Sequence, residues 1–229
     1  ERPVARLAVL PVAAKASVEQ GLEAALESAL AHWLYHDEIW LRGNAKAKAE
    51  ILLAIARVRH ALVLFGGIVP RKATTHLRAL LNDADAVLLA ADTADEALFR
   101  TEVVGAKLAL TEWLVQRGWR PFLNEAGEKK IAGSFKRFAD IHLSRVAAEL
   151  RSAVQHLAVE DAADQLPKLS RDIDSVQLLA GAYGDAVAPW LENWQELQRA
   201  IEHDDRSVFE YFRRQALAAE PFWLHSGKR

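Results

Sequence analysis

The residues best suited to chemistry are cations in the segment 51–70, where Arg57, Arg59 and His60 stand among aliphatic side chains. Residues 42–78 hold eight Lys or Arg residues and one acidic residue, a local charge of +7 in a chain of net charge −2. Arg can offer two parallel hydrogen bonds to phosphate oxygens, and Lys and His offer single donors. The stretch indicates an anion site, although ordinary solvated helix faces also concentrate charge.

Further cations follow on two later segments. Residues 129–151 contain six Lys or Arg residues against two acidic ones, and Lys168 and Arg171 lie one helical turn apart. We expect these faces to line, with the first stretch, one basic groove that holds a polyanion. The candidate anion-binding residues are Arg57, Arg59, His60, Arg71, Lys72, Arg78, Lys136, Arg137, Arg145, Lys168 and Arg171.

Other candidate sites are weaker. His32 and His36 are four residues apart and so share a helix face, but no third or fourth metal ligand can be assigned to them. Asp140 and His142 point about 200° apart on a helix, which excludes an acid–base pair there. The chain has no cysteine, no glycine-rich phosphate loop and no nucleophile elbow. We therefore expect no catalytic residue, no metal and no cofactor.

Apolar periodicity predicts an all-α fold. Capping boxes at Ser17 and Thr93 mark two helix starts, Asn44 is expected to cap another helix, and Gly66-Gly67 is expected to end it. The first half, about residues 17–118, is predicted to hold four helices, over residues 17–42, 51–65, 70–89 and 93–118.

The second half, about residues 134–229, is predicted to hold four more helices. Residues 119–133, which contain Pro121, Gly127 and Gly133, are the expected hinge between the halves. The aromatic tail 221–229 is expected to fold back on the second half. The predicted helices are residues 134–154, a helix after Pro167 that closes at Gly181 and Gly184, residues 190–201 and residues 208–217.

The ends of the chain and its composition lead to further expectations. Residues 1–16, with prolines at 3 and 11, are interpreted as a linker or docking segment, and residues 17–229 as the helical domain. Because the chain begins with Glu and contains no Met, we expect it to be a fragment of a longer protein. The absence of cysteine fits a cytoplasmic location, and no apolar run reaches the roughly 18 residues of a membrane span.

The sequence ARVRHALVLFGGIVP, residues 56–70, resembles the signature helix of the CHAD domain (conserved histidine α-helical domain). The chain is also similar to the C-terminal part of bacterial inorganic triphosphatases that join an N-terminal CYTH domain to a CHAD domain. The resemblance implies two four-helix halves related by a pseudo-twofold, with a basic groove that binds inorganic polyphosphate. It also implies that triphosphate hydrolysis belongs to the CYTH partner domain. The similar segments are HALVLFGGIVPRKATTHLR, SFKRFADIHLSR, QLPKLSRDIDS and EPFWLHSGKR.

Several motif positions depart from the family pattern. Ala49 and Leu52 stand where relatives carry a histidine and an arginine, and Ala56 replaces the first arginine of the signature. On the later basic helix, Asp172, Ile173 and Asp174 occupy positions where cations or a tyrosine are expected. These changes leave two functions open: a polyanion-binding module, and a degenerate scaffold that positions or dimerises a CYTH domain. Membrane and nucleic-acid partners are not expected.

Overall fold

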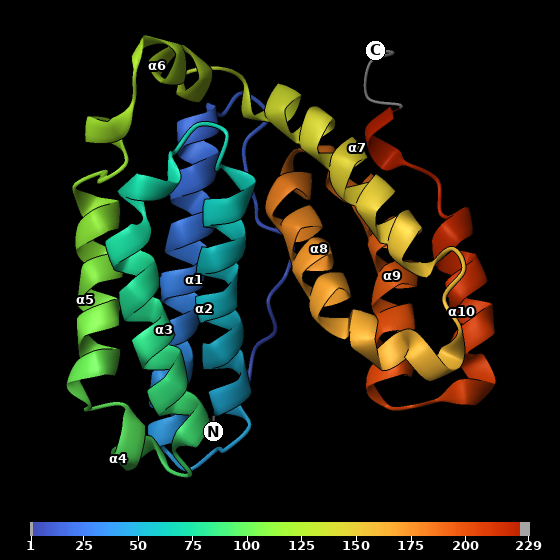
Figure 1. The fold of residues 1–229 in the computed structure, drawn as a ribbon, viewed down its shortest axis with the longest axis horizontal. Coiled ribbons are helices and arrows are strands. Elements are labelled where there is room, and N and C mark those ends of the chain that lie inside the picture. The colour runs from blue at the N-terminus through green and yellow to red at the C-terminus, as the bar shows by residue number, and fades with distance from the viewer. Residues whose placement is uncertain (1, 225–229) are drawn as a thin grey trace. The chain divides into compact units, whose positions relative to one another are not determined.

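The computed structural model describes residues 2–224, and the secondary structure of these residues is helical with no β-strand among them (Figure 1). No helix in this range has both the length and the apolar content needed to cross a bilayer. The described chain divides into two compact units. Unit 1 comprises residues 2–8 and 17–133, and unit 2 comprises residues 9–16 and 134–224.

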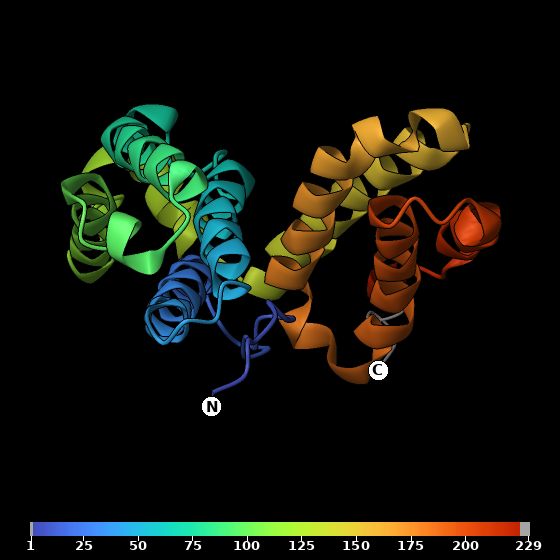
Figure 2. The same cartoon turned by 90° about the horizontal axis from the view of Figure 1, so that it is seen from below.

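Unit 1 is built around α1, α2, α3 and α5, which run side by side (Figures 1 and 2). α1 packs on α2 and α3 packs on α5, and α1–α5 and α2–α3 contacts close the bundle. Trp33, Ile55 and Leu62 lie in its core, almost without exposed surface. The elements of unit 1 are α1 (Val18–Leu41), α2 (Ala47–Leu64), η1 (Arg71–Ala73), α3 (Thr75–Ala90), α4 (Ala94–Ala97), α5 (Thr101–Val115), η2 (Arg120–Phe122) and α6 (Glu125–Ile131).

The two predicted capping boxes are confirmed. Ser17 Oγ accepts from Gln20 N–H at 3.1 Å at the start of α1, and the box at Thr93 starts α4. The single helix predicted over residues 93–118 is wrong, however. α4 ends at Ala97, and α5 begins only after Arg100 has taken an extended backbone conformation (φ −66°, ψ 142°). The interruption buries Leu98, which is 3% exposed.

Both predicted ends of the second helix also need correction. Asn44 Oδ1 accepts from Lys46 N–H at 3.1 Å, but α2 begins at Ala47 and has no side-chain cap. At the other end, neither Gly66 nor Gly67 takes the left-handed conformation expected of a C-cap. Backbone bonds back to Phe65 turn the chain instead, from Ile68 N–H and Val69 N–H, both at 2.9 Å.

Unit 2 is a second set of packed helices, with α7 on α8, α8 on α9 and α9 on α10. The aromatic tail folds back on this set as far as Leu224, with the Phe222 and Trp223 rings 5.9 Å and 5.7 Å from the Trp190 ring. Residues 225–229 of that prediction lie outside the described range. The elements are α7 (Phe135–Val154), η3 (Val159–Gln165), α8 (Leu166–Leu179), η4 (Ala180–Ala186), α9 (Val187–Glu202), α10 (Arg206–Ala218) and η5 (Phe222–Leu224).

The N-terminal segment docks within both units. In unit 1, Ala5 N–H donates to His36 Nε2 at 3.1 Å. In unit 2, Leu10 N–H donates to the Gln177 carbonyl at 2.9 Å. A Cβ at position 181 would lie 1.9 Å from the Leu10 carbonyl oxygen, so Gly181 is required for this close approach. Residues 2–16 are thus a docked segment rather than a free linker.

Candidate functional site

Arg57, at the centre of the predicted basic stretch, lies inside unit 1. It is 2% exposed, and its guanidinium donates to the Ala8 carbonyl at 3.1 Å and to Ser28 Oγ at 3.4 Å. Its neighbours one turn away, Ala54 and Ala61, are fully buried, and their small side chains leave room for it. Arg57 therefore connects the N-terminal segment to the α1–α2 pair.

Arg59 and His60 occupy the half-buried side of α2. Arg59 reaches across to α3, where it donates to Asn82 Oδ1 at 2.8 Å and to Asp85 Oδ2 at 3.3 Å. Both members of the Arg59–Asp85 pair keep somewhat over a quarter of their side-chain surface exposed. The Arg59 guanidinium is thus held by α3, and an anion would have to compete with Asp85 for it.

A different arrangement is found at the start of α3, in the basic cluster formed by Arg71, Lys72 and Arg78. Arg71 and Lys72 are exposed and Arg78 is half-buried. Within the described part of the chain, none of the three has a carboxylate partner, and Arg78 Nε is buried without an acceptor. Burial, and then the charge of Arg71, lower the pKa of Arg78. No carboxylate in the described part of the chain therefore pairs with this positive charge.

The backbone beneath this basic cluster is fixed. The Arg71 carbonyl accepts from Thr74 Oγ1 at 2.9 Å and from Thr75 Oγ1 at 3.2 Å, and Thr74 is 1% exposed. The first N–H groups of α3 lack acceptors inside their own helix, and the helix dipole adds positive potential at this end. Side-chain and backbone donors are therefore combined at the junction of η1 and α3.

In unit 2, the predicted cations lie on α7 and α8 and are partly engaged. Lys136 is 3.6 Å from Asp140 Oδ1 and lies over the Tyr183 ring, 4.9 Å from its centroid. Tyr183 O–H donates to the same Asp140 carboxylate. Burial, followed by this hydrogen bond and the Asp140 charge, raises the pKa of Tyr183. Lys136 thus belongs to a local network.

The remaining unit 2 cations fall into two classes. Arg137 and Arg145 are exposed and Lys168 is half-buried, and among the described residues none of them has a carboxylate partner. Arg171 instead lies 3.3 Å from Asp172. Asp172 is 3% exposed. Burial raises its pKa, and the charge and hydrogen bond of Arg171 oppose that shift.

The family model of the CHAD domain matches residues 24–214 of this chain. The chain belongs to the CHAD domain family. Its fold is also similar to the crystal structure of the CHAD domain from the plant Ricinus communis, with a TM-score of 0.65 and 17% sequence identity. That match covers 98% of this chain and 89% of the other. The match therefore includes helices of both units of this CHAD domain.

In this CHAD domain, the positions that depart from the family signature lie on the outer side of α2. Ala49 is exposed, and Leu52 and Ala56 are half-buried. Leu53 and Val63 add apolar surface on the same helix, at 41% and 63% exposed. The solvent-facing side of α2 is therefore largely apolar, and the basic cluster at the start of α3 groups three cations of the predicted 42–78 stretch that have no carboxylate partner among the described residues.

The histidine pair has a third neighbour that sequence spacing did not reveal. Ligand atoms of His32, His36 and Glu50 lie within 4.8 Å of one another, and His32 Nε2 is 2.8 Å from Glu50 Oε2. Because Ala5 N–H must be a donor, His36 Nε2 accepts from it and His36 Nδ1–H donates to the His32 carbonyl at 2.7 Å. His36 Nε2 thus holds the N-terminal segment on α1, and the Nδ1–H bond within α1 fixes the orientation of the ring.

Proposed function

We propose that this CHAD domain binds a linear inorganic polyanion, inorganic polyphosphate in particular, and that in unit 1 the basic cluster Arg71, Lys72 and Arg78 makes the contacts. The observation that carries the proposal is the absence of any carboxylate partner for these three cations within residues 2–224. A cation that already has an intramolecular acceptor must exchange it for phosphate, whereas an open cation gains a partner.

The fixed backbone at the η1–α3 junction supports the same proposal. The buried Thr74 anchors the turn, so little backbone conformational entropy is lost when an anion binds there. The helix N-terminus adds N–H donors oriented towards an anion. In unit 2, the open cations Arg137, Arg145 and Lys168 offer further contacts to a long chain of phosphates.

Triphosphate hydrolysis is not part of the proposal for this chain. Among the described residues, His32, His36 and Glu50 are the one group suited to hold a metal. His32 Nε2 and both His36 nitrogens already take part in hydrogen bonds within unit 1. We propose instead that the chain shares its task with a CYTH domain in the cytoplasm, on the basis of the sequence segments that resemble those of CYTH–CHAD triphosphatases. A CYTH domain would hydrolyse triphosphate, and this domain would hold longer chains.

The direct test is a titration of the full chain with long-chain polyphosphate and with tripolyphosphate at two salt concentrations. A multivalent electrostatic contact predicts that affinity rises with chain length and falls steeply as salt is added, by the same counterion release that governs nucleic-acid binding. Binding that is independent of length, or unchanged by salt, would contradict the proposal.

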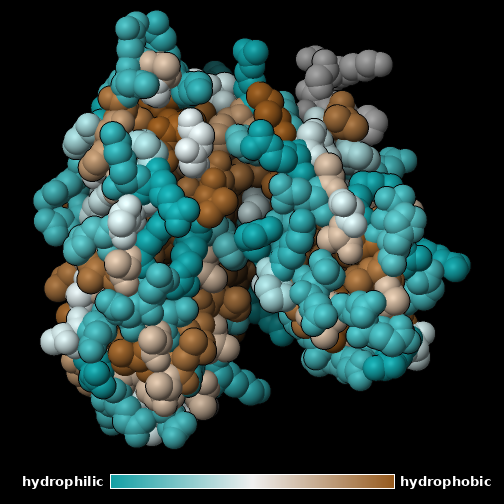
Figure 3. Space-filling view, viewed as in Figure 1, coloured by the Kyte–Doolittle hydropathy of each residue, from teal (hydrophilic) through white to brown (hydrophobic). Residues whose placement is uncertain are grey.

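A second candidate function is the docking of another domain, and the outer face of α5 supports it. Val104, Leu108 and Val115 fall on one side of this helix and are 37%, 63% and 76% exposed. Brown apolar surface is visible among polar residues on unit 1 (Figure 3). Large apolar side chains exposed together on one helix face are typical of protein contacts. If α5 docks a CYTH domain, Leu108→Glu should abolish co-purification with that domain and leave polyphosphate binding unchanged.

A further inference from the structure

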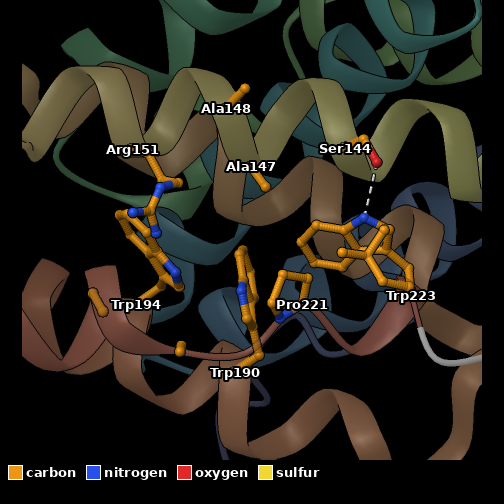
Figure 4. A pocket seen from close by; sticks show the side chains of 11 residues that line it. Ser144, Ala147, Ala148, Arg151, Trp190, Trp194, Pro221 and Trp223 are labelled. Atoms are coloured by element: carbon orange, nitrogen blue, oxygen red, sulfur yellow. Dashed lines mark hydrogen bonds between the residues drawn. The ribbon is translucent and has the colours of Figure 1, made fainter.

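Unit 2 contains a pocket of about 200 Å³ that the proposed polyanion site does not involve. α7 contributes Ser144 and Arg151 to its lining, and α9 contributes Trp190 and Trp194. The segment after α10 closes it with Pro221 and Trp223. Figure 4 shows Arg151 and Trp194 towards one end, Ser144 and Trp223 towards the other, and Trp190 and Pro221 between them.

The walls of this pocket are aromatic and held in place. The Trp190 ring centroid lies 5.7 Å from both the Trp194 and the Trp223 centroids. Trp223 Nε1–H donates to Ser144 Oγ at 2.9 Å (Figure 4), so the tail that closes the pocket is anchored to α7. An apolar cavity of about 150 Å³ can hold benzene. The pocket therefore has room for one or two small rings.

Among the described residues that line the pocket, Arg151 is the one that carries a charge. The residue is exposed, and one terminal N–H donates to the Leu217 carbonyl at 2.5 Å, which orients the guanidinium. Within the described chain, no carboxylate pairs with it. Because a guanidinium carries five N–H donors, the remaining N–H groups can donate hydrogen bonds to an anionic group. Such a pocket favours an anion over a neutral or cationic molecule.

We infer that this pocket binds a small planar aromatic molecule carrying one carboxylate, whose ring packs against the indoles while Arg151 pairs with the carboxylate. Indole rings contact flat ligands in stacked or edge-to-face geometry, and Arg recognises carboxylates through charge-assisted hydrogen bonds. Inorganic polyphosphate has no apolar part, so the inference is independent of the proposed polyanion site.

The test uses 2-naphthoate as the probe and its uncharged amide, 2-naphthamide, as the matched ligand. Of the seven tryptophans of the chain, Trp190, Trp194 and Trp223 line the pocket. In ¹H–¹⁵N spectra of the full chain, 2-naphthoate should shift the indole N–H signals of these three. The signals of the unit 1 tryptophans are the internal control and should stay in place.

Arg151→Gln separates the charged contact from general apolar adhesion. It should weaken 2-naphthoate binding at least tenfold, the typical worth of a charged hydrogen bond, and leave 2-naphthamide binding unchanged. Arg214→Gln is the matched control, because Arg214 is exposed and pairs with Glu210 away from the pocket lining.

Four results would overturn the inference. The first three are an absence of shifts in the three pocket indoles at millimolar 2-naphthoate, equal binding of the carboxylate and the amide, and equal binding by Arg151→Gln and the unsubstituted chain. Pocket shifts that appear on raising the protein concentration without the probe would instead identify a second copy of the chain as the occupant. That outcome would also overturn it.

Discussion

The middle of α2 and the junction of η1 with α3 belong to one basic stretch of sequence but use their charges differently. Arg57 is 2% exposed and bonded to the N-terminal segment, and Arg59 is bonded to α3. Arg71 and Lys72 are exposed, without a carboxylate partner in the described chain. Local charge density in the sequence therefore locates cations but does not predict which of them are available to a ligand.

Of the substitutions considered, Arg57→Ala should have the largest effect on the free energy of unfolding. The substitution leaves the Ala8 carbonyl and Ser28 without their donor and should lower the free energy of unfolding by about 2–3 kcal/mol, the scale of a lost charged hydrogen bond with its unpaired partner. Chemical denaturation measures it. Arg71→Ala, from the open cluster, is the matched control and should change stability by less than about 0.5 kcal/mol. Equal effects of the two substitutions on stability would contradict the distinction between the bonded Arg57 and the open Arg71.

Glu19 is a carboxylate that, like the Arg57 guanidinium, is held by hydrogen bonds inside unit 1. It is 8% exposed and accepts from Trp119 Nε1–H at 2.9 Å and Arg120 Nε–H at 3.0 Å. Burial alone would raise its pKa, but the hydrogen bonds from Arg120 and Trp119, together with the Arg120 and Arg117 charges, hold the pKa below its ordinary 4.5. Glu19→Gln should therefore cost about 1–2 kcal/mol of stability at neutral pH.

The sign of the pH dependence follows from that lowered pKa. The stability supplied by Glu19 is complete above the unfolded-state value of 4.5 and is lost as pH falls through the lower folded-state value. The difference in free energy of unfolding between the original chain and Glu19→Gln should therefore shrink below that pH. A difference that stays constant down to full acid unfolding would show that the Glu19 charge has no such role.

The Arg59–Asp85 pair should give a smaller effect. Both side chains are partly exposed, and pairs of this kind contribute about 0–1 kcal/mol. A double-mutant cycle with Arg59→Ala and Asp85→Ala should return a coupling energy in that range. A coupling energy above about 2 kcal/mol would instead show that Arg59 contributes as much to the free energy of unfolding as Arg57 does.

The sequence predicted the helical fold well because helix signals are local. Apolar periodicity located the principal helices, and the capping boxes at Ser17 and Thr93 marked true starts. The break before α5 was missed, since Leu98 and Arg100 carry no glycine or proline signal and the interruption comes from burial of Leu98 against the rest of unit 1.

The candidate site was harder to predict, since availability of a cation is a tertiary property. Arg57 bonds to Ala8, 49 residues away, and Glu50 completes the His32–His36 cluster from another helix. One local signal was present for Arg57: Ala54 and Ala61, one turn to either side, mark a face with room for a long buried side chain. No comparable pattern in the sequence identified Arg71, Lys72 and Arg78 as open.

The most direct test of the account compares two sets of variants in their affinity for long-chain polyphosphate at low salt. The triple substitution Arg71→Ala, Lys72→Ala and Arg78→Ala should weaken binding roughly ten- to hundredfold and flatten the salt dependence, because fewer counterions are exchanged. Arg59→Ala, which removes a cation already held by α3, should bind within about twofold of the original chain. An unchanged affinity in the triple variant, or an equal loss in Arg59→Ala, would contradict the claim that open cations make the site.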